Sequence, residues 1–192
     1  MSSHQTNPDC LKPDVANTEH LGNQPIYNMV AVDNDSLQAE IEQVFQSLCD
    51  QPQHTPEQEI IVRKAIELYL VAFKYYDLSR TRALVHPNYK QHSTMATSDG
   101  QDSIIEVAQL MKTIASEHWK GTGEPHFKID PQRIMVDGEY VICQVHGKRW
   151  ENDSGQHVFD MYRYRDGQFV EHWDVVMDVP ATSTTTNGNG VF

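Results

Sequence analysis

The fold is decided by residues 137–179, which read DGEYVICQVHGKRWENDSGQHVFDMYRYRDGQFVEHWDVVMDV. Side chains along this stretch alternate with the period of two that is typical of β-strands. Three turn signals interrupt the alternation: Asp137-Gly138, Asp153-Ser154-Gly155 and Asp166-Gly167. Together with the residues just before the first turn, the pattern predicts an antiparallel meander of strands at 126–136, 139–151, 156–165 and 168–179.

The residues before these strands carry helical patterns. Thr55-Pro56-Glu57-Gln58 has the order of an N-cap, a proline at N1 and a glutamine that completes a capping box, so a long helix is predicted to begin there. A shorter helix is expected at 78–85, and a third helix is expected to be capped by Ser98 or Asp99. Helices followed by a run of strands indicate the α+β class.

The amino-terminal part differs in composition from the rest of the chain. Residues 1–55 form a polar extension in which acidic side chains far outnumber the single basic residue, Lys12. One short helix is predicted inside it, at Ser36 to Leu48, and we expect this helix to dock on the domain or on a partner subunit. The domain itself is predicted at 56–180, and residues 181–192 are predicted to form a flexible tail.

Charge and composition exclude several classes of function. The formal net charge of −12 repels phosphate backbones and anionic membrane surfaces, so neither nucleic acid nor a membrane is an expected partner. The sequence contains no apolar run of the roughly 20 residues that span a bilayer, and its polar start does not resemble a signal peptide. We therefore expect a cytoplasmic protein, in which the three widely spaced cysteines are reduced thiols.

The last strand places two ionisable side chains on one face. His172 and Asp174 are two residues apart, so strand alternation points them the same way. A three-residue loop, Arg165 to Gly167, would pair Tyr164 with Gln168 and place Asp160 opposite His172. A two-residue loop would instead turn Asp160 toward the other face, so the geometry depends on this turn.

The preceding hairpin extends the same polar face. A five-residue loop, 151–155, would pair Trp150 with Gln156 and place His146 opposite Asp160. One face would then collect five polar side chains from three strands: Gln144, His146, Asp160, His172 and Asp174. Burying such groups under apolar helices costs free energy unless they are paired, so their concentration predicts a pocket.

The ordered set of short segments in the domain resembles a known family. The segments are Tyr89-Lys90-Gln91-His92, Asp137-Gly138-Glu139-Tyr140-Val141, Val145-His146-Gly147, Phe159-Asp160-Met161-Tyr162-Arg163 and the stretch from Asp166 to Val175 that contains Glu171-His172-Trp173-Asp174. With these, residues 57–180 resemble the SnoaL-like polyketide cyclases. The resemblance implies the cone-shaped fold of ketosteroid isomerase and nuclear transport factor 2, a curved half-barrel sheet packed on three helices, and a homodimer formed through the outer sheet face.

The resemblance also implies a chemistry and assigns roles to residues. SnoaL-type cyclases close a polyketide ring by an intramolecular aldol reaction without metal or cofactor, so the expected partner is a small hydrophobic molecule that contains a carbonyl group. Asp160 matches the acid/base position, with His146 and Gln144 one strand away, and His172 is a further catalytic candidate. The expected substrate-binding residues are Gln144, His92 at the pocket mouth, Asp174, Tyr162 and Tyr69.

Three other interpretations of the same residues remain open. Asp160 could be a structural carboxylate that pairs with Arg163 or Arg149. His172 and Asp174, with His146 or His92, have the composition of a two-histidine, one-carboxylate site for Fe(II) or Zn(II). The domain could also be a non-catalytic module that binds a small ligand or mediates dimers, because a fold alone does not determine function.

Overall fold

The computed structural model describes residues 32–48, 50–120, 125–180 and 186–192. The elements follow in the order α1 (Asn34–Ser47), α2 (Pro56–Tyr69), a π-helical turn η1 (Leu70–Lys74), α3 (Leu78–Leu84), β1 (Val85–Gln91), α4 (Gln101–His118), β2 (Lys128–Asp137), β3 (Tyr140–Lys148), β4 (Gln156–Arg165) and β5 (Gln168–Asp178). The predicted α+β class is confirmed. Among the described helices, none is long and apolar enough to cross a membrane.

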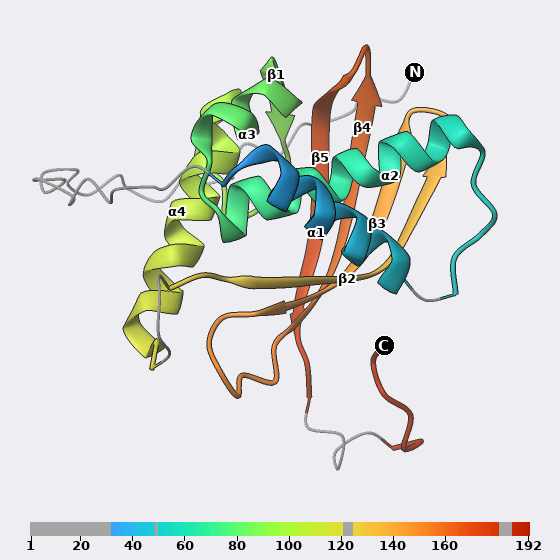
Figure 1. Cartoon of the computed structure of the whole chain (residues 1–192). Coiled ribbons are helices and arrows are strands. Elements are labelled where there is room, and N and C mark those ends of the chain that lie inside the picture. Colours follow the sequence, from blue (N-terminus) through green and yellow to red (C-terminus); the bar gives the residue numbers. More distant parts are fainter. Residues whose placement is uncertain (1–31, 49, 121–124, 181–185) are drawn as a thin grey trace, which may run out of the picture.

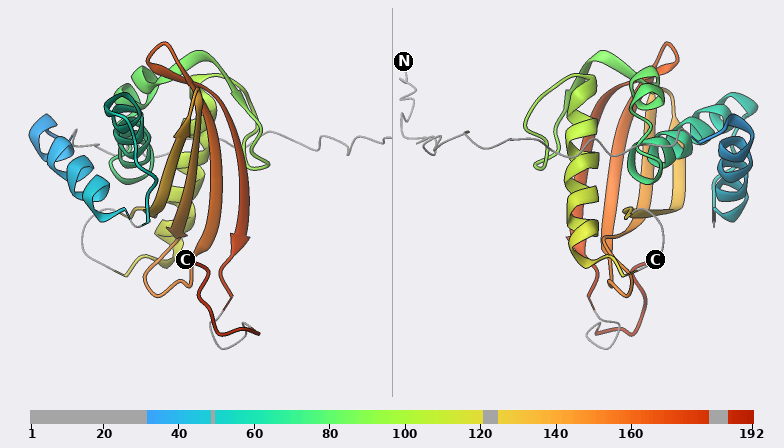
Figure 2. Two further views of the ribbon diagram at one scale, coloured as in Figure 1. Left: turned by 90° about the vertical axis from the view of Figure 1, so that its right-hand side faces the viewer. Right: turned by 60° about the vertical axis from the view of Figure 1, so that its left-hand side comes forward.

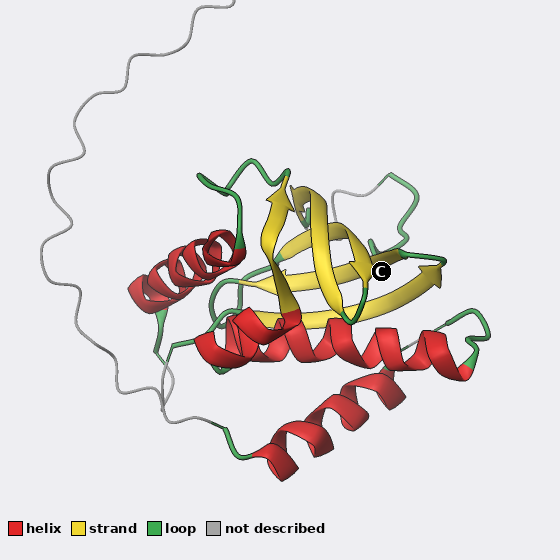
Figure 3. Cartoon of the chain, turned by 90° about the horizontal axis from the view of Figure 1, so that it is seen from above, coloured by secondary structure: helices red, strands yellow, loops and turns green. Residues whose placement is uncertain are grey.

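One curved sheet organises the domain. Its strand order is β1-β5-β4-β3-β2, with β1 parallel to β5 and the other neighbours antiparallel. The helices lie on the concave side of this sheet, and α2 crosses it in front of the strands (Figures 1 and 2). Seen from above, the curvature of the strands and the position of α1 outside α2 are plain (Figure 3). The predicted half-barrel packed on helices is confirmed.

Side chains cap the amino-terminal ends of α1 and α2, whereas α4 lacks the cap that was predicted for it. Thr55 caps α2 in a capping box with Gln58, as predicted, and the Asp33 side chain caps α1. Helix α4 begins after Gly100 without a side-chain cap, so the predicted cap by Ser98 or Asp99 is wrong. The Asp99 carboxylate instead accepts a hydrogen bond from the backbone N–H of Gln91 at 3.0 Å.

Helix α1 docks on the same chain. Its Leu37 and Ile41 are 0 % and 3 % exposed and share the core with α2, where Ile66 is equally buried. At the edge of this contact, Glu42 pairs with Arg63 at 3.0 Å, and Glu40 bonds the side chains of Lys74 and Tyr75. The helix predicted at 36–48 therefore covers the outer side of α2.

The β4–β5 hairpin places Asp160, His172 and Asp174 on one face, as predicted, but its turn differs from the predicted one. Its turn has two residues, Asp166 and Gly167, both at positive φ (52° and 85°), so the predicted three-residue loop is wrong. After the pair Tyr164–Phe169, Val170 is an extra residue in β5 that forms a β-bulge. The bulge shifts the following pairs by one residue, which returns Asp160 to the face of His172 and Asp174.

The bulge also changes the position of one aromatic residue. Strict alternation from His172 back to Phe169 would point Phe169 away from the polar face. Phe169 is instead fully buried in the core, where its ring lies 5.2 Å from the ring of Tyr162 and 5.0 Å from that of Tyr164.

The predicted register of the β3–β4 hairpin is wrong by three residues. Asp160 pairs with Cys143 rather than with His146, and Gln144 and His146 pair with Phe159 and His157. A shift by an odd number of residues reverses the face, so Gln144 and His146 point away from Asp160.

The physical reason lies in the loop between these strands. Arg149 clamps Asp153 through two hydrogen bonds of 2.8 and 3.0 Å, and Asn152 and Gly155 take left-handed conformations (φ 67° and 88°). The loop is therefore longer than the predicted 151–155, and the ladder begins only at the pair Gly147–Gln156.

The docking of α1 can be tested with matched substitutions. We expect Leu37→Ala to lower the free energy of unfolding by about 2–5 kcal/mol, because it leaves a cavity where a fully buried side chain was packed. Leu110→Ala is the control, since Leu110 is 43 % exposed on α4, and its effect should stay within about 0.5 kcal/mol. Denaturant titration measures both, and equal effects would contradict the docking of α1.

The Arg149–Asp153 clamp predicts a pH dependence. The hydrogen bonds from Arg149 lower the pKa of Asp153 from 3.8 to about 2, so the stabilisation is present above pH 4 and is lost as the pH falls toward 2. We expect Asp153→Asn to lower the free energy of unfolding by about 1–2 kcal/mol at pH 7, with the difference from the natural protein narrowing below pH 4. Asp130→Asn, an exposed position on β2, should show no such difference. If the difference in the free energy of unfolding between Asp153→Asn and the natural protein did not change with pH, the role of this ion pair would be contradicted.

Candidate active site

A cavity lies between the concave face of the sheet and the helices. Its volume is about 70 Å³, several times what one water molecule requires. Most of its wall is apolar and includes side chains from η1, from α4 and from the loops before α4 and β2: Phe73, Met95, Ile104, Val107, Met111 and Phe127. The polar side chains of β1, β4 and β5 meet at one side of this apolar space, as expected for a ligand pocket.

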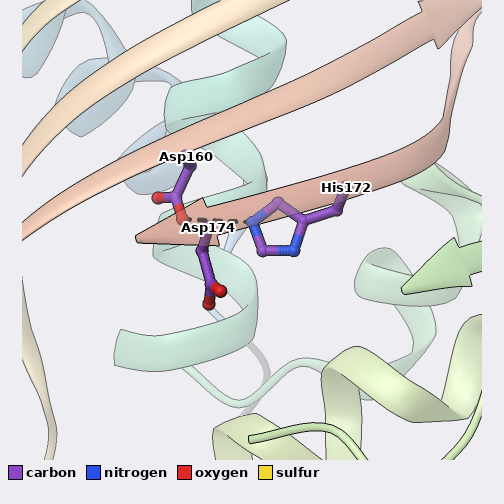
Figure 4. A group of neighbouring side chains, drawn as sticks. All are labelled: Asp160, His172 and Asp174. Atoms are coloured by element: carbon purple, nitrogen blue, oxygen red, sulfur yellow. Dashed lines mark hydrogen bonds and ion pairs between the residues drawn. The ribbon is translucent and has the colours of Figure 1, made fainter. Parts of the chain in front are cut away.

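Asp160 of β4 is the more buried of the two carboxylates in the cavity. It is 7 % exposed, and its Oδ2 accepts a hydrogen bond of 2.5 Å from the hydroxyl of Tyr69, which α2 brings across the sheet. Its Oδ1 lies 3.1 Å from Nε2 of His172 on the neighbouring strand (Figure 4). The position directly opposite Asp160 on β5 is Asp174.

The arginines that sequence analysis offered as structural partners of Asp160 bond elsewhere. Arg163 pairs with Glu171 at 2.8 Å and donates to the hydroxyl of Tyr140, and Arg149 pairs with Asp153. Among the described residues that line the cavity, none is lysine or arginine. The partners of the Asp160 carboxylate are therefore a phenol and an imidazole.

The hydrogen bonds of His172 fix its ring. Nδ1 lies 2.6 Å from Oε1 of Gln91, and the same Oε1 accepts from the backbone N–H of Ser93 at 3.3 Å, which identifies it as the carbonyl oxygen of the amide. Since a carbonyl oxygen only accepts, Nδ1 carries a proton. One further proton then lies between Nε2 and Asp160, either as imidazolium with carboxylate or as imidazole with carboxylic acid.

Asp174 supplies a second carboxylate to the same space. It is half-buried, and its Oδ2 accepts a hydrogen bond of 2.6 Å from the hydroxyl of Ser93. One ligand atom from each of Asp160, His172 and Asp174 lies within 4.8 Å of the others, so these residues could hold a divalent cation. The predicted two-histidine set is not assembled, because neither His146 nor His92 lines the cavity.

Three buried tyrosines surround this cluster. Burial, followed by the negative charge of Asp160, raises the pKa of Tyr69, Tyr89 and Tyr162 well above 10, so all three remain neutral phenols. The ring of Tyr162 stacks on the imidazole of His172, with centroids 4.5 Å apart. Tyr69 and Tyr162 line the cavity, as predicted.

The predicted placement of His146 and Gln144 is wrong. His146 bonds the carbonyl oxygen of Ser154 at 2.9 Å and stacks on Phe192. Gln144 is held on the same outer face, where its amide bonds the side chains of Arg133 at 2.7 Å and His157 at 3.0 Å. The reversed register of β3 is the reason in both cases.

His92 also lies away from the cavity. Its ring stacks on Trp173 with centroids 5.0 Å apart, and its Nε2 lies 3.0 Å from Glu171. The preceding residue, Gln91, enters the cavity in its place, because β1 runs parallel to β5 and pairs Gln91 with His172.

Sequence analysis missed Tyr89, Gln91 and Ser93. The signal for two of them was present, since the alternation of the extended segment 89–92 puts Tyr89 and Gln91 on one face and His92 on the other. The parallel pairing of β1 with β5 carried no sequence signal, and without it the inward face of this segment could not be identified.

The comparisons with known proteins point to one family. A family model described as a SnoaL-like domain matches residues 66–172. No functionally curated protein matches the chain significantly. A solved structure of a proposed polyketide cyclase from Bacillus cereus ATCC 10987 is similar in fold, with a TM-score of 0.53 and 16 % identity over 68 % of this chain and 84 % of that one.

A second solved structure is more distant. It is IdmH, a proposed polyketide cyclase from Streptomyces antibioticus, with a TM-score of 0.46 and 18 % identity over 64 % of this chain and 92 % of that one. At these identities the likeness concerns the fold alone.

The ring orientation of His172 can be measured directly. We expect nitrogen NMR to show a protonated Nδ1 in the natural protein, and we expect Gln91→Leu to remove this resonance because the acceptor is lost. Gln109→Leu, an exposed position on α4, should leave the spectrum of His172 unchanged. A bare Nδ1 in the natural protein would contradict the bond to Gln91.

Proposed function

The chain belongs to the SnoaL-like domain family, and on that premise we propose that its cavity is the active site of an enzyme that moves a proton next to a carbonyl group in a small hydrophobic molecule. The match at 66–172 includes Tyr69, Tyr89, Asp160 and His172, the polar groups that converge in the cavity. Asp160 is the proposed acid/base group.

The observation that carries this proposal is the environment of Asp160. The carboxylate is nine-tenths buried beside an apolar wall, and its two oxygens are held by Tyr69 and by His172 rather than by an arginine or a lysine. A buried carboxylate held in this way beside an apolar space is positioned to accept a proton from a carbon atom of a bound molecule.

The proposed reaction begins with a C–H bond adjacent to the substrate carbonyl. The proton passes to the carboxylate of Asp160, and the electron pair of the broken bond moves to the carbonyl oxygen, which becomes an enolate. In a ketone with a double bond between its β and γ carbons, isomerisation follows when the proton returns at the γ carbon and the double bond comes to lie between the α and β carbons. Aldol closure follows when the enolate carbon attacks a second carbonyl carbon, whose oxygen then receives the proton. Neither route consumes a cofactor.

The neighbours of Asp160 have separate tasks in this proposal. His172 exchanges the shared proton with Asp160 through Nε2, while Gln91 keeps Nδ1 protonated and the ring in place. Tyr69 holds the second carboxylate oxygen, so the carboxylate is oriented before the substrate arrives. The apolar wall keeps water from the enolate.

Exchange of α-protons tests the proposed chemistry. We expect the natural protein to accelerate deuterium incorporation into simple apolar ketones such as 2-tetralone and 2-indanone in D₂O, measured by proton NMR. Asp160→Asn should lower this rate about 100-fold or more, the usual contribution of a general base. Asp130→Asn, an exposed carboxylate on the same sheet, is the matched control and should keep the full rate.

Two outcomes would count against the proposal. If Asp160→Asn exchanged α-protons as fast as the natural protein, Asp160 would not be the base. If ketones bound in the cavity but exchanged no faster than in buffer, the domain would be a ligand-binding module, the alternative that the same fold allows.

A further inference from the structure

One buried polar atom in the cavity is left unexplained by the proposed reaction. The side chain of Tyr89 on β1 is 0 % exposed and lines the cavity, and its hydroxyl has no hydrogen-bond partner among the described residues. Two other buried tyrosines differ, since Tyr69 donates to Asp160 and the hydroxyl of Tyr76 accepts from the backbone N–H of Phe127. An unpartnered buried hydroxyl destabilises a fold, so its position on a cavity wall points to a ligand.

The chemistry of the phenol defines what it can bind. Burial and the charges of Asp160 and Asp174 keep Tyr89 protonated, so its hydroxyl carries a proton that needs a hydrogen-bond acceptor, although its oxygen can also accept. An ammonium group would be attracted by the two carboxylates and could donate to the phenol oxygen, but it would leave the phenol proton without an acceptor. A carboxylate offers an acceptor, but the same two carboxylates repel it, and the described cavity wall contains no lysine or arginine to offset this. A neutral carbonyl oxygen offers an acceptor and carries no net charge that the two carboxylates would repel.

We propose that the hydroxyl of Tyr89 donates a hydrogen bond to the carbonyl oxygen of a neutral, apolar ketone bound in the cavity. The choice of a ketone rests on the proposed function, whereas the donor role of Tyr89 rests on its burial and its unpartnered hydroxyl. The bond orients the ketone so that the carbon next to the carbonyl faces Asp160. It becomes stronger as negative charge develops on the oxygen, which is the property that lowers the barrier to enolate formation.

Pairs of ligands that differ only in the carbonyl group test this assignment. The probes are 2-tetralone with tetralin and 2-indanone with indane, and their dissociation constants are measured by NMR titration. Tyr89→Phe should weaken binding of the ketones about tenfold and leave the hydrocarbons unchanged, because only the ketones lose a hydrogen bond. Tyr164→Phe also removes a tyrosine hydroxyl from the sheet, but outside the cavity, and should change the affinity for neither the ketones nor the hydrocarbons.

Thermal unfolding of the same variants separates a ligand-binding hydroxyl from a structural one. Removing an unpartnered buried hydroxyl should leave the unfolding midpoint of Tyr89→Phe unchanged or raise it. A midpoint lowered more than that of Tyr164→Phe would show that the hydroxyl serves the fold and would overturn the proposal. Ketone affinity retained in Tyr89→Phe, equal loss for ketone and hydrocarbon, or no binding of either ketone to the natural protein would also overturn it.

The result is independent of the catalytic test. If Asp160→Asn kept the full exchange rate while Tyr89→Phe lost ketone affinity selectively, the acid/base assignment would fail and the assignment of Tyr89 would stand. If exchange depended on Asp160 but Tyr89→Phe bound ketones normally, the proposed function would stand and this inference would fail.

Discussion

A carboxylate on the covered face of a sheet has to be solvated by the protein itself, and this requirement organises the structure around Asp160. Three elements that are distant in sequence contribute to its surroundings. Helix α2 crosses the sheet and delivers Tyr69, β5 delivers His172, and β1 delivers Gln91, which holds the far nitrogen of the imidazole. The arrangement of helices on the concave face is thus coupled to the chemistry of one side chain.

The sequence patterns located the elements well, and the errors arose in the pairing between them. The faces of the β4–β5 hairpin were predicted because the pairing error was an even number of residues, Asp174 rather than His172 opposite Asp160. The error in the β3–β4 hairpin was odd, so His146 and Gln144 were assigned to the wrong face. Neither the bulge at Val170 nor the clamp of Asp153 by Arg149 follows from local propensity, since each depends on the packed structure.

The candidate site was predicted in part for a second reason. Histidine and carboxylate side chains are easily recognised in a sequence as candidates for a site. Of the predicted residues of these types, Asp160, His172 and Asp174 line the cavity. Its other polar groups are an amide, Gln91, and the hydroxyl of Ser93, residue types that are common in every loop and strand. They acquire a role only from the parallel pairing of β1 with β5, a contact between segments about 80 positions apart.

The single extra residue at Val170 has a consequence for how such a domain can diverge. Because this residue alone sets which way His172 and Asp174 point, its deletion would exchange the two faces of β5 and carry Trp173 and Val175 inward in their place. A change of side chain at the same position leaves the direction of every later residue intact. The orientation of the site residues on β5 therefore depends on the length of this hairpin and not on which side chain occupies position 170.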